Sequence, residues 1–105
     1  MTEKLIRDLI PKLAADRGQH LPVREAAPAE LPVLLRMKLA EECVEAIDAS
    51  LDGLLEELAD VLEVVHALAG LHGHSLAELE QARAAKATTR GGFKQGFVLE
   101  LEEGR

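Results

Sequence analysis

Residues 37–65 combine two acidic clusters with apolar residues at helical spacing, and this pattern strongly constrains the fold. The first cluster, residues 41–45, has the sequence Glu-Glu-Cys-Val-Glu, and the second, residues 56–60, has Glu-Glu-Leu-Ala-Asp. Between them, residues 50–53 (Ser-Leu-Asp-Gly) favour a turn. The flanking apolar residues are Leu35, Leu39, Val44, Ile47, Leu54, Leu58, Leu62 and Val65. Together these features predict a hairpin of two amphipathic helices.

Four carboxylates fall at matching heights on this predicted hairpin. Residues three apart share a helix face, so Glu42 points with Glu45, and Glu57 points with Asp60. If the chain folds back around residue 51, Glu42 lies level with Asp60, and Glu45 lies level with Glu57. Carboxylates on helices roughly 8–10 Å apart repel one another unless a cation lies between them. Because hard divalent ions select all-oxygen ligands, we expect a Mg²⁺ site, with Mn²⁺ as a substitute ion.

A solvated acidic helix face is the simpler alternative, because acidic residues often recur at three- or four-residue spacing on the water side of a helix. Two clusters in register favour the metal site. Asp60 favours it further, since it is flanked by Ala59 and Val61 within an apolar run.

Three motifs, in order along the chain, resemble one enzyme family. The acidic residues follow the pattern Glu-Glu-x-x-Glu, a helical spacer, then Glu-x-x-Asp. Residues 4–11 are similar to a Lys-Leu-Val-Arg-Asp-Lys-Ile-Pro opening, with Leu9 in place of the second Lys. At the other end, Lys86 followed by residues 90–93 is similar to a closing Arg-Gly-Gly-Phe segment. This combination resembles the all-α nucleotide pyrophosphohydrolases of the MazG-like and phosphoribosyl-ATP pyrophosphatase-like group, and specifically a small single-domain branch.

The resemblance implies a Mg²⁺-dependent hydrolase of house-cleaning type. Such an enzyme cleaves the α–β phosphoanhydride of a nucleoside triphosphate into the monophosphate and pyrophosphate. The expected metal ligands are Glu42, Glu45, Glu57 and Asp60. One of these ligands, or the neighbouring Glu41, is expected to act as general base for the attacking water, and the sequence does not distinguish among them.

Three cations are candidates for binding the phosphates. Lys38 lies one turn before Glu42, so it could form an ion pair with Glu42, bind phosphate, or do both. Lys86 and Arg90 lie at the end of a predicted helix, where cations are favourable in any case. The resemblance favours a role for both in gripping the triphosphate, Arg90 as a planar fork and Lys86 as a point charge.

The composition predicts one all-α domain that spans residues 1–105. The chain is 48% hydrophobic but only 2% aromatic, so its core must consist of aliphatic side chains, as in packed helices. The predicted helices cover residues 8–17, 29–50, 52–71 and 75–88. Ser75, with Glu78 three residues later, predicts a capping box at the start of the last one. A short strand at residues 21–25 is expected to pair with residues 97–101, where apolar and acidic residues alternate.

The third predicted helix, residues 52–71, is apolar around much of its circumference, so it needs more cover than one small chain can give. We therefore expect a homodimer or a higher homo-oligomer. The resemblance implies that two hairpins pair into a four-helix bundle.

Charge and composition limit the partners. A net charge of −7 disfavours nucleic acid, which needs clustered cations. No apolar run approaches the roughly 20 residues of a membrane span, and no signal peptide is evident, so we expect a cytoplasmic protein without a membrane partner. The single cysteine, Cys43, fits a reducing compartment and is expected to pack as a small apolar residue.

Two other functions remain open at this point. Phosphoribosyl-ATP pyrophosphatase of histidine biosynthesis would use the same chemistry on a different nucleotide. A non-catalytic helical dimerisation or regulatory module would instead carry its acidic residues as solvated surface.

Overall fold

The structure, a computed structural model, describes residues 3–102, and within this range it contains four α-helices and no strand. In chain order these are α1 (Ile10–Asp16), α2 (Leu31–Asp48), α3 (Leu54–Leu71) and α4 (Leu76–Arg90). The all-α prediction is confirmed, and each predicted helix is present with its ends shifted by a few residues. None of these helices combines the length and the apolar character that crossing a membrane requires.

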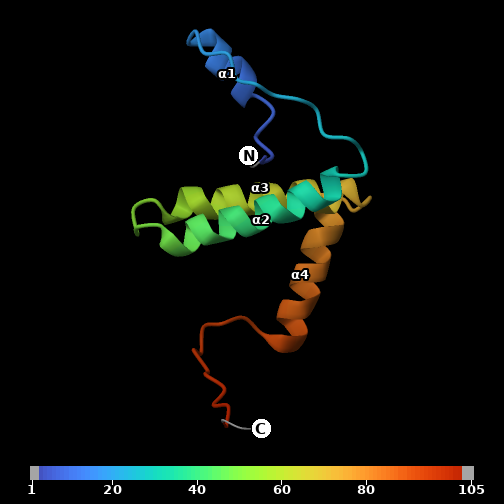
Figure 1. Cartoon of the computed structure of the whole chain (residues 1–105). Coiled ribbons are helices and arrows are strands. Elements are labelled where there is room, and N and C mark those ends of the chain that lie inside the picture. Colours follow the sequence, from blue (N-terminus) through green and yellow to red (C-terminus); the bar gives the residue numbers. More distant parts are fainter. Residues whose placement is uncertain (1–2, 103–105) are drawn as a thin grey trace.

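Helices α2 and α3 lie side by side as an antiparallel hairpin (Figure 1), as the acidic and apolar pattern predicted. The chain leaves α2 because Ala49 adopts an extended conformation. The amide of Gly53 then donates to the carbonyl of Ser50 at 3.1 Å and closes the turn. Leu35 on α2 and Val64 on α3 are buried. The hairpin therefore fixes the heights at which the acidic clusters meet.

The residues before α1 lie close to the hairpin, whereas α1 itself lies apart from it (Figure 1). Leu5 and Ile6 are half-buried. Pro11 is accommodated in the first turn of α1, where a missing amide costs no helical hydrogen bond. Gly18 follows the helix with φ of 79°, a conformation that favours glycine.

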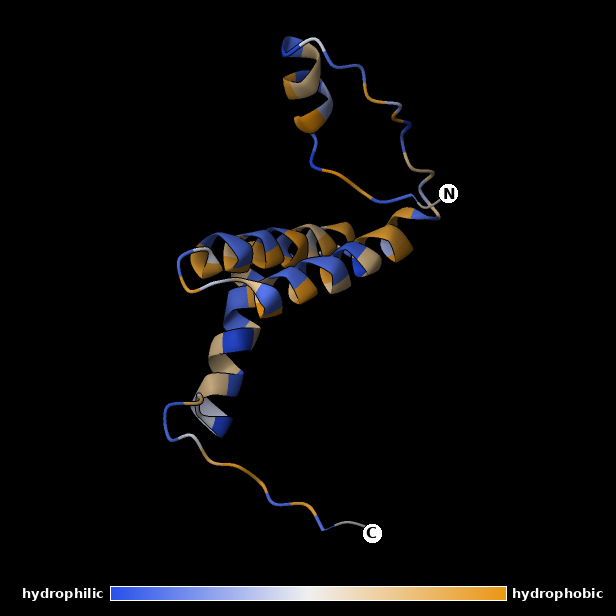
Figure 2. Cartoon of the chain, turned by 60° about the vertical axis from the view of Figure 1, so that its left-hand side comes forward, coloured by the Kyte–Doolittle hydropathy of each residue, from blue (hydrophilic) through white to orange (hydrophobic). Residues whose placement is uncertain are grey.

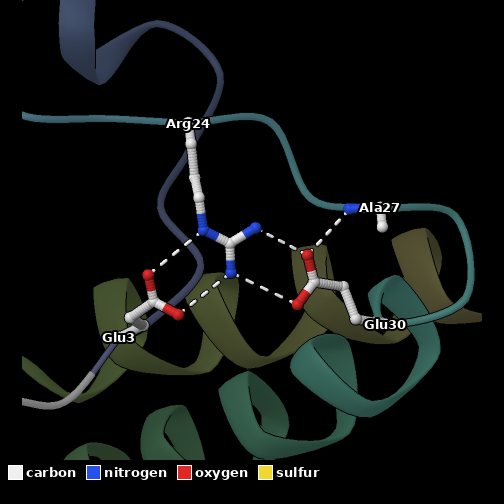
Figure 3. Close-up of polar contacts among 4 residues, drawn as sticks. All are labelled: Glu3, Arg24, Ala27 and Glu30. Atoms are coloured by element: carbon white, nitrogen blue, oxygen red, sulfur yellow. Dashed lines mark hydrogen bonds and ion pairs between the residues drawn. The ribbon is translucent and has the colours of Figure 1, made fainter.

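Arg24 ties three segments of the chain together (Figure 3). Its guanidinium donates to Glu3 at 2.9 and 3.1 Å and to Glu30 at 2.6 and 3.2 Å. Glu30 also accepts the amide of Ala27 at 2.8 Å. The hydrogen bond from Arg24, followed by that from Ala27, lowers the pKa of Glu30 to about 2. Because Arg24 and Glu3 are exposed and Glu30 is only half-buried, the contact positions residue 3 more than it stabilises the fold.

Helix α4 contacts the end of the hairpin through α3 and then extends away from it (Figure 1). It begins at the predicted capping box: the amide of Glu78 donates to Ser75 Oγ at 3.1 Å, and the amide of Ser75 donates to Glu78 Oε1 at 2.9 Å. Gly91, with φ of 82°, ends it.

The single chain buries few of its apolar side chains. Its radius of gyration is 18.0 Å, whereas a compact domain of this length has about 13 Å. Figure 2 shows apolar residues along the outside of the hairpin and in the tail. The most exposed large ones on the hairpin are Leu51 (91%), Ile47 (80%) and Leu55 (79%). The two segments predicted to pair as strands, residues 21–25 and 97–101, are irregular in the single chain, so their pairing stays a prediction.

Candidate metal site

Three carboxylates from the two hairpin helices converge at one point. Glu42 comes from α2, and Glu57 and Asp60 come from α3, three residues apart. One oxygen of each lies within 4.8 Å of the other two. The antiparallel register predicted from the sequence is the reason that they meet, because it sets Glu42 level with this part of α3.

Within the described residues 3–102, two oxygens of this carboxylate triad (Glu42, Glu57 and Asp60) accept no hydrogen bond. They are Glu42 Oε2 and Glu57 Oε2, and both are buried. Glu42 is also the one buried charged residue within residues 3–102, at 7% exposure. A buried, unpaired carboxylate oxygen is costly, because it has lost its water and gained no donor. A hard dication satisfies such oxygens, so the donors present fit Mg²⁺.

Glu45, the fourth predicted ligand, is exposed and does not belong to the converging triad. Three of the four predicted ligands therefore meet in the single chain. The negative charge of Glu42, followed by burial and the charge of Glu57, raises the pKa of Glu45 above its ordinary value. Glu45 thus lies close enough for the negative charges of Glu42 and Glu57 to repel its own.

Lys38 lies beside the triad and forms the ion pair with Glu42 that the sequence left open as one of its two roles. Its Nζ is 3.2 Å from Glu42 Oε1 and 3.2 Å from Glu41 Oε2, and its side chain is 14% exposed. Burial lowers the pKa of Lys38, but hydrogen bonds to Glu41 and Glu42 outweigh burial and raise it overall. Lys38 is therefore a fixed positive charge at the edge of the carboxylates.

Sequence reasoning assigned no site role to two further cations that reach this cluster. Arg7 Nη2 is 2.6 Å from Asp60 Oδ1, and Lys4 Nζ is 3.2 Å from Glu41 Oε1. Both belong to the motif at residues 4–11, which contributed to the family resemblance but carries no metal-ligand pattern. The available clue was two cations three residues apart, with the apolar pair Leu5 and Ile6 between them. Their pairing with α2 and α3 depends on tertiary contacts across 37 and 53 residues of sequence.

Lys86 and Arg90, the other predicted phosphate ligands, lie exposed on α4. Neither side chain forms an ion pair within residues 3–102, and α4 extends away from the hairpin. The single chain therefore does not bring these two cations to the carboxylates. Cys43, on α2, is a half-buried free thiol.

Comparison of the chain with protein-family models, with curated proteins and with solved structures gives no match.

Glu57→Gln is expected to stabilise the metal-free protein by about 1 kcal/mol, because the new amide can donate to a neighbouring charged carboxylate and one negative charge is removed. The same substitution should remove most of the stabilisation that Mg²⁺ gives. Urea unfolding of both proteins, with EDTA and then with Mg²⁺, measures the two effects.

Glu56→Gln is the matched control, because Glu56 is the exposed neighbour of Glu57 and lies outside the triad. It should leave the Mg²⁺-dependent stabilisation intact. If Glu57→Gln and Glu56→Gln behave alike, the triad is a solvated acidic surface and binds no ion.

Proposed function

We propose that the protein is a Mg²⁺-dependent nucleotide pyrophosphohydrolase, which cleaves a nucleoside triphosphate between the α and β phosphates to give a monophosphate and pyrophosphate. The observation that carries the proposal is the pair of buried, unpartnered oxygens on Glu42 and Glu57. The motifs at residues 4–11, 41–60 and 86–93 support it, since they resemble those of the MazG-like pyrophosphohydrolases.

The charges around the triad support a dication in particular. Five carboxylates lie in or beside it, and three cations, Lys4, Arg7 and Lys38, are paired with them. The acids exceed the bases by two charges, so one dication would make the group neutral. A site of this charge favours Mg²⁺ or Mn²⁺ over a monovalent ion.

Glu42, Glu57 and Asp60 would hold the ion, with Glu45 as the neighbouring fourth ligand. When bound, Mg²⁺ supplies charge neutralisation for the phosphates and acidifies a water molecule. One of Glu41, Glu42 and Glu45 would accept the proton of the attacking water. Lys38 would keep its ammonium beside the carboxylates and stabilise the negative charge of the substrate.

A second copy of the chain is part of this proposal. The single chain buries little apolar area, because leucines and an isoleucine of the hairpin are exposed and the radius of gyration is large. Two hairpins that pack on these faces would form a four-helix bundle. Such a dimer could also bring Lys86 and Arg90 of one copy toward the carboxylates of the other.

Glu42→Gln should reduce Mg²⁺-dependent pyrophosphate release by at least about 100-fold, because it removes a ligand charge from the site. The assay separates nucleotide products by chromatography and measures pyrophosphate, so that α–β cleavage is distinguished from release of phosphate. The substrate panel contains canonical, deoxy and damaged triphosphates and phosphoribosyl-ATP.

Glu56→Gln should retain wild-type activity on the same panel. Turnover of phosphoribosyl-ATP alone would instead assign the histidine-pathway reaction. A wild-type protein that releases no pyrophosphate from any substrate, with or without Mg²⁺, would leave the non-catalytic module as the better description.

The chain should sediment with at least twice its single-chain mass of 11.4 kDa. Leu58→Asp should shift this equilibrium toward the monomer, because it places a charge on the half-exposed apolar face of α3. Leu99→Asp, in the exposed tail, is the control and should leave the mass unchanged. Analytical ultracentrifugation measures the mass of the wild type and of both variants. A wild-type protein that is helical but monomeric would contradict the proposed assembly.

A further inference from the structure

Residues 3–7, called here the N-terminal segment, are held by a contact at each end, one to the connection between α1 and α2 and one to α3 of the hairpin. At its start, Glu3 is held by two hydrogen bonds from Arg24 (Figure 3). At its end, Arg7 is bonded to Asp60 of the triad at 2.6 Å. Between these contacts, Lys4 pairs with Glu41. Two cations, Lys4 and Arg7, are thereby presented to the acidic cluster from outside the hairpin.

A cavity of about 240 Å³ lies between this segment and α2. Lys4 and Lys38 line it, together with Glu41 and the apolar side chains of Leu34 and Met37. Lys38 also contacts Glu42, so the cavity adjoins the triad. A ligand that enters it would meet two ammonium groups next to the metal ligands. This combination suits a phosphate chain whose metal-bound part lies over the triad.

The contact between Arg7 and Asp60 competes with a metal ion for the same carboxylate. Asp60 contributes an oxygen to the triad and also accepts the guanidinium of Arg7. A dication bound to Asp60 would neutralise the charge that holds Arg7. A guanidinium presents a planar fork of donors that matches phosphate oxygens. Arg7 would then be available to bind the phosphates of a metal-bound nucleotide.

We propose that the N-terminal segment is a phosphate-binding wall of the substrate site, in which Arg7 and Lys4 pair with carboxylates in the metal-free protein and with the triphosphate in the loaded one. This inference rests on the proposed function and adds to it two substrate-binding residues and a cavity. Arg24 acts on the segment only through Glu3, so it is a positioning residue.

If this is so, removal of Arg7 should have opposite effects on the affinity for Mg²⁺ and on the affinity for a phosphate chain. Arg7→Gln removes a competitor for Asp60, so Mg²⁺ alone should bind about two- to fivefold more tightly, as expected for loss of a partly exposed ion pair. It also removes a charge-assisted hydrogen bond to phosphate, so inorganic tripolyphosphate in the presence of Mg²⁺ should bind about tenfold more weakly or worse. If Arg7 had only a structural role, its removal would weaken the binding of Mg²⁺ and the binding of tripolyphosphate together.

Isothermal titration calorimetry of the full chain measures both affinities. Arg83→Gln is the matched control, because Arg83 is an exposed arginine on α4 that pairs only with Glu80 within residues 3–102, and it should change neither affinity. Arg7→Lys keeps the charge but loses the fork; it should leave Mg²⁺ binding near wild type and give an intermediate loss for tripolyphosphate. If circular dichroism shows that Arg7→Gln does not fold, Arg7→Lys takes its place as the test variant.

The outcomes separate this inference from the function on which it rests. If the wild-type chain binds no Mg²⁺, the proposed function itself fails. If it binds Mg²⁺ and tripolyphosphate, but Arg7→Gln and Arg7→Lys leave both affinities unchanged or weaken both equally, the function stands and the phosphate-binding role of the N-terminal segment is wrong.

Discussion

Glu42 and Glu57 place carboxylate oxygens between two packed helices, where those oxygens are buried and accept no hydrogen bond from the described residues 3–102. This arrangement opposes folding, because each buried charge must be compensated. The chain compensates part of it with Lys38 from the same helix and with Arg7 and Lys4 from the N-terminal segment. The five carboxylates in and beside the triad exceed these three cations by two charges, which matches one dication. This match links the stability of the hairpin to its proposed chemistry.

Much of the hairpin could be predicted from the sequence, because its causes are local. Apolar residues at a helical period define α2 and α3, and the Ser-Leu-Asp-Gly turn sets their register. The register then places Glu42 opposite Glu57 and Asp60. The capping box of Ser75 and Glu78 is equally local and was predicted correctly. In each case, neighbours within four residues determine the structure.

The features that sequence reasoning missed depend on contacts between distant parts of the chain. Nothing near Arg7 indicates that its partner is Asp60, 53 residues later. The exposure of Glu45 depends on how α2 is rotated about its own axis. The three-residue spacing between Glu42 and Glu45 predicts that rotation only approximately. The positions of α1 and α4, and of Lys86 and Arg90 with them, depend on apolar faces that the single chain leaves uncovered. Such features require the packing partner to be known.

Anomalous scattering from crystals grown with Mn²⁺ would locate the ion itself. We expect one strong anomalous peak between α2 and α3, with oxygens of Glu42, Glu57 and Asp60 about 2.0–2.3 Å from the ion, as for hard dications in oxygen sites. Arg7 should be displaced from Asp60 in that crystal once a phosphate ligand is present. Mn²⁺ at saturating concentration with no peak at these carboxylates, or with peaks only at scattered surface acids, would contradict the proposed metal site.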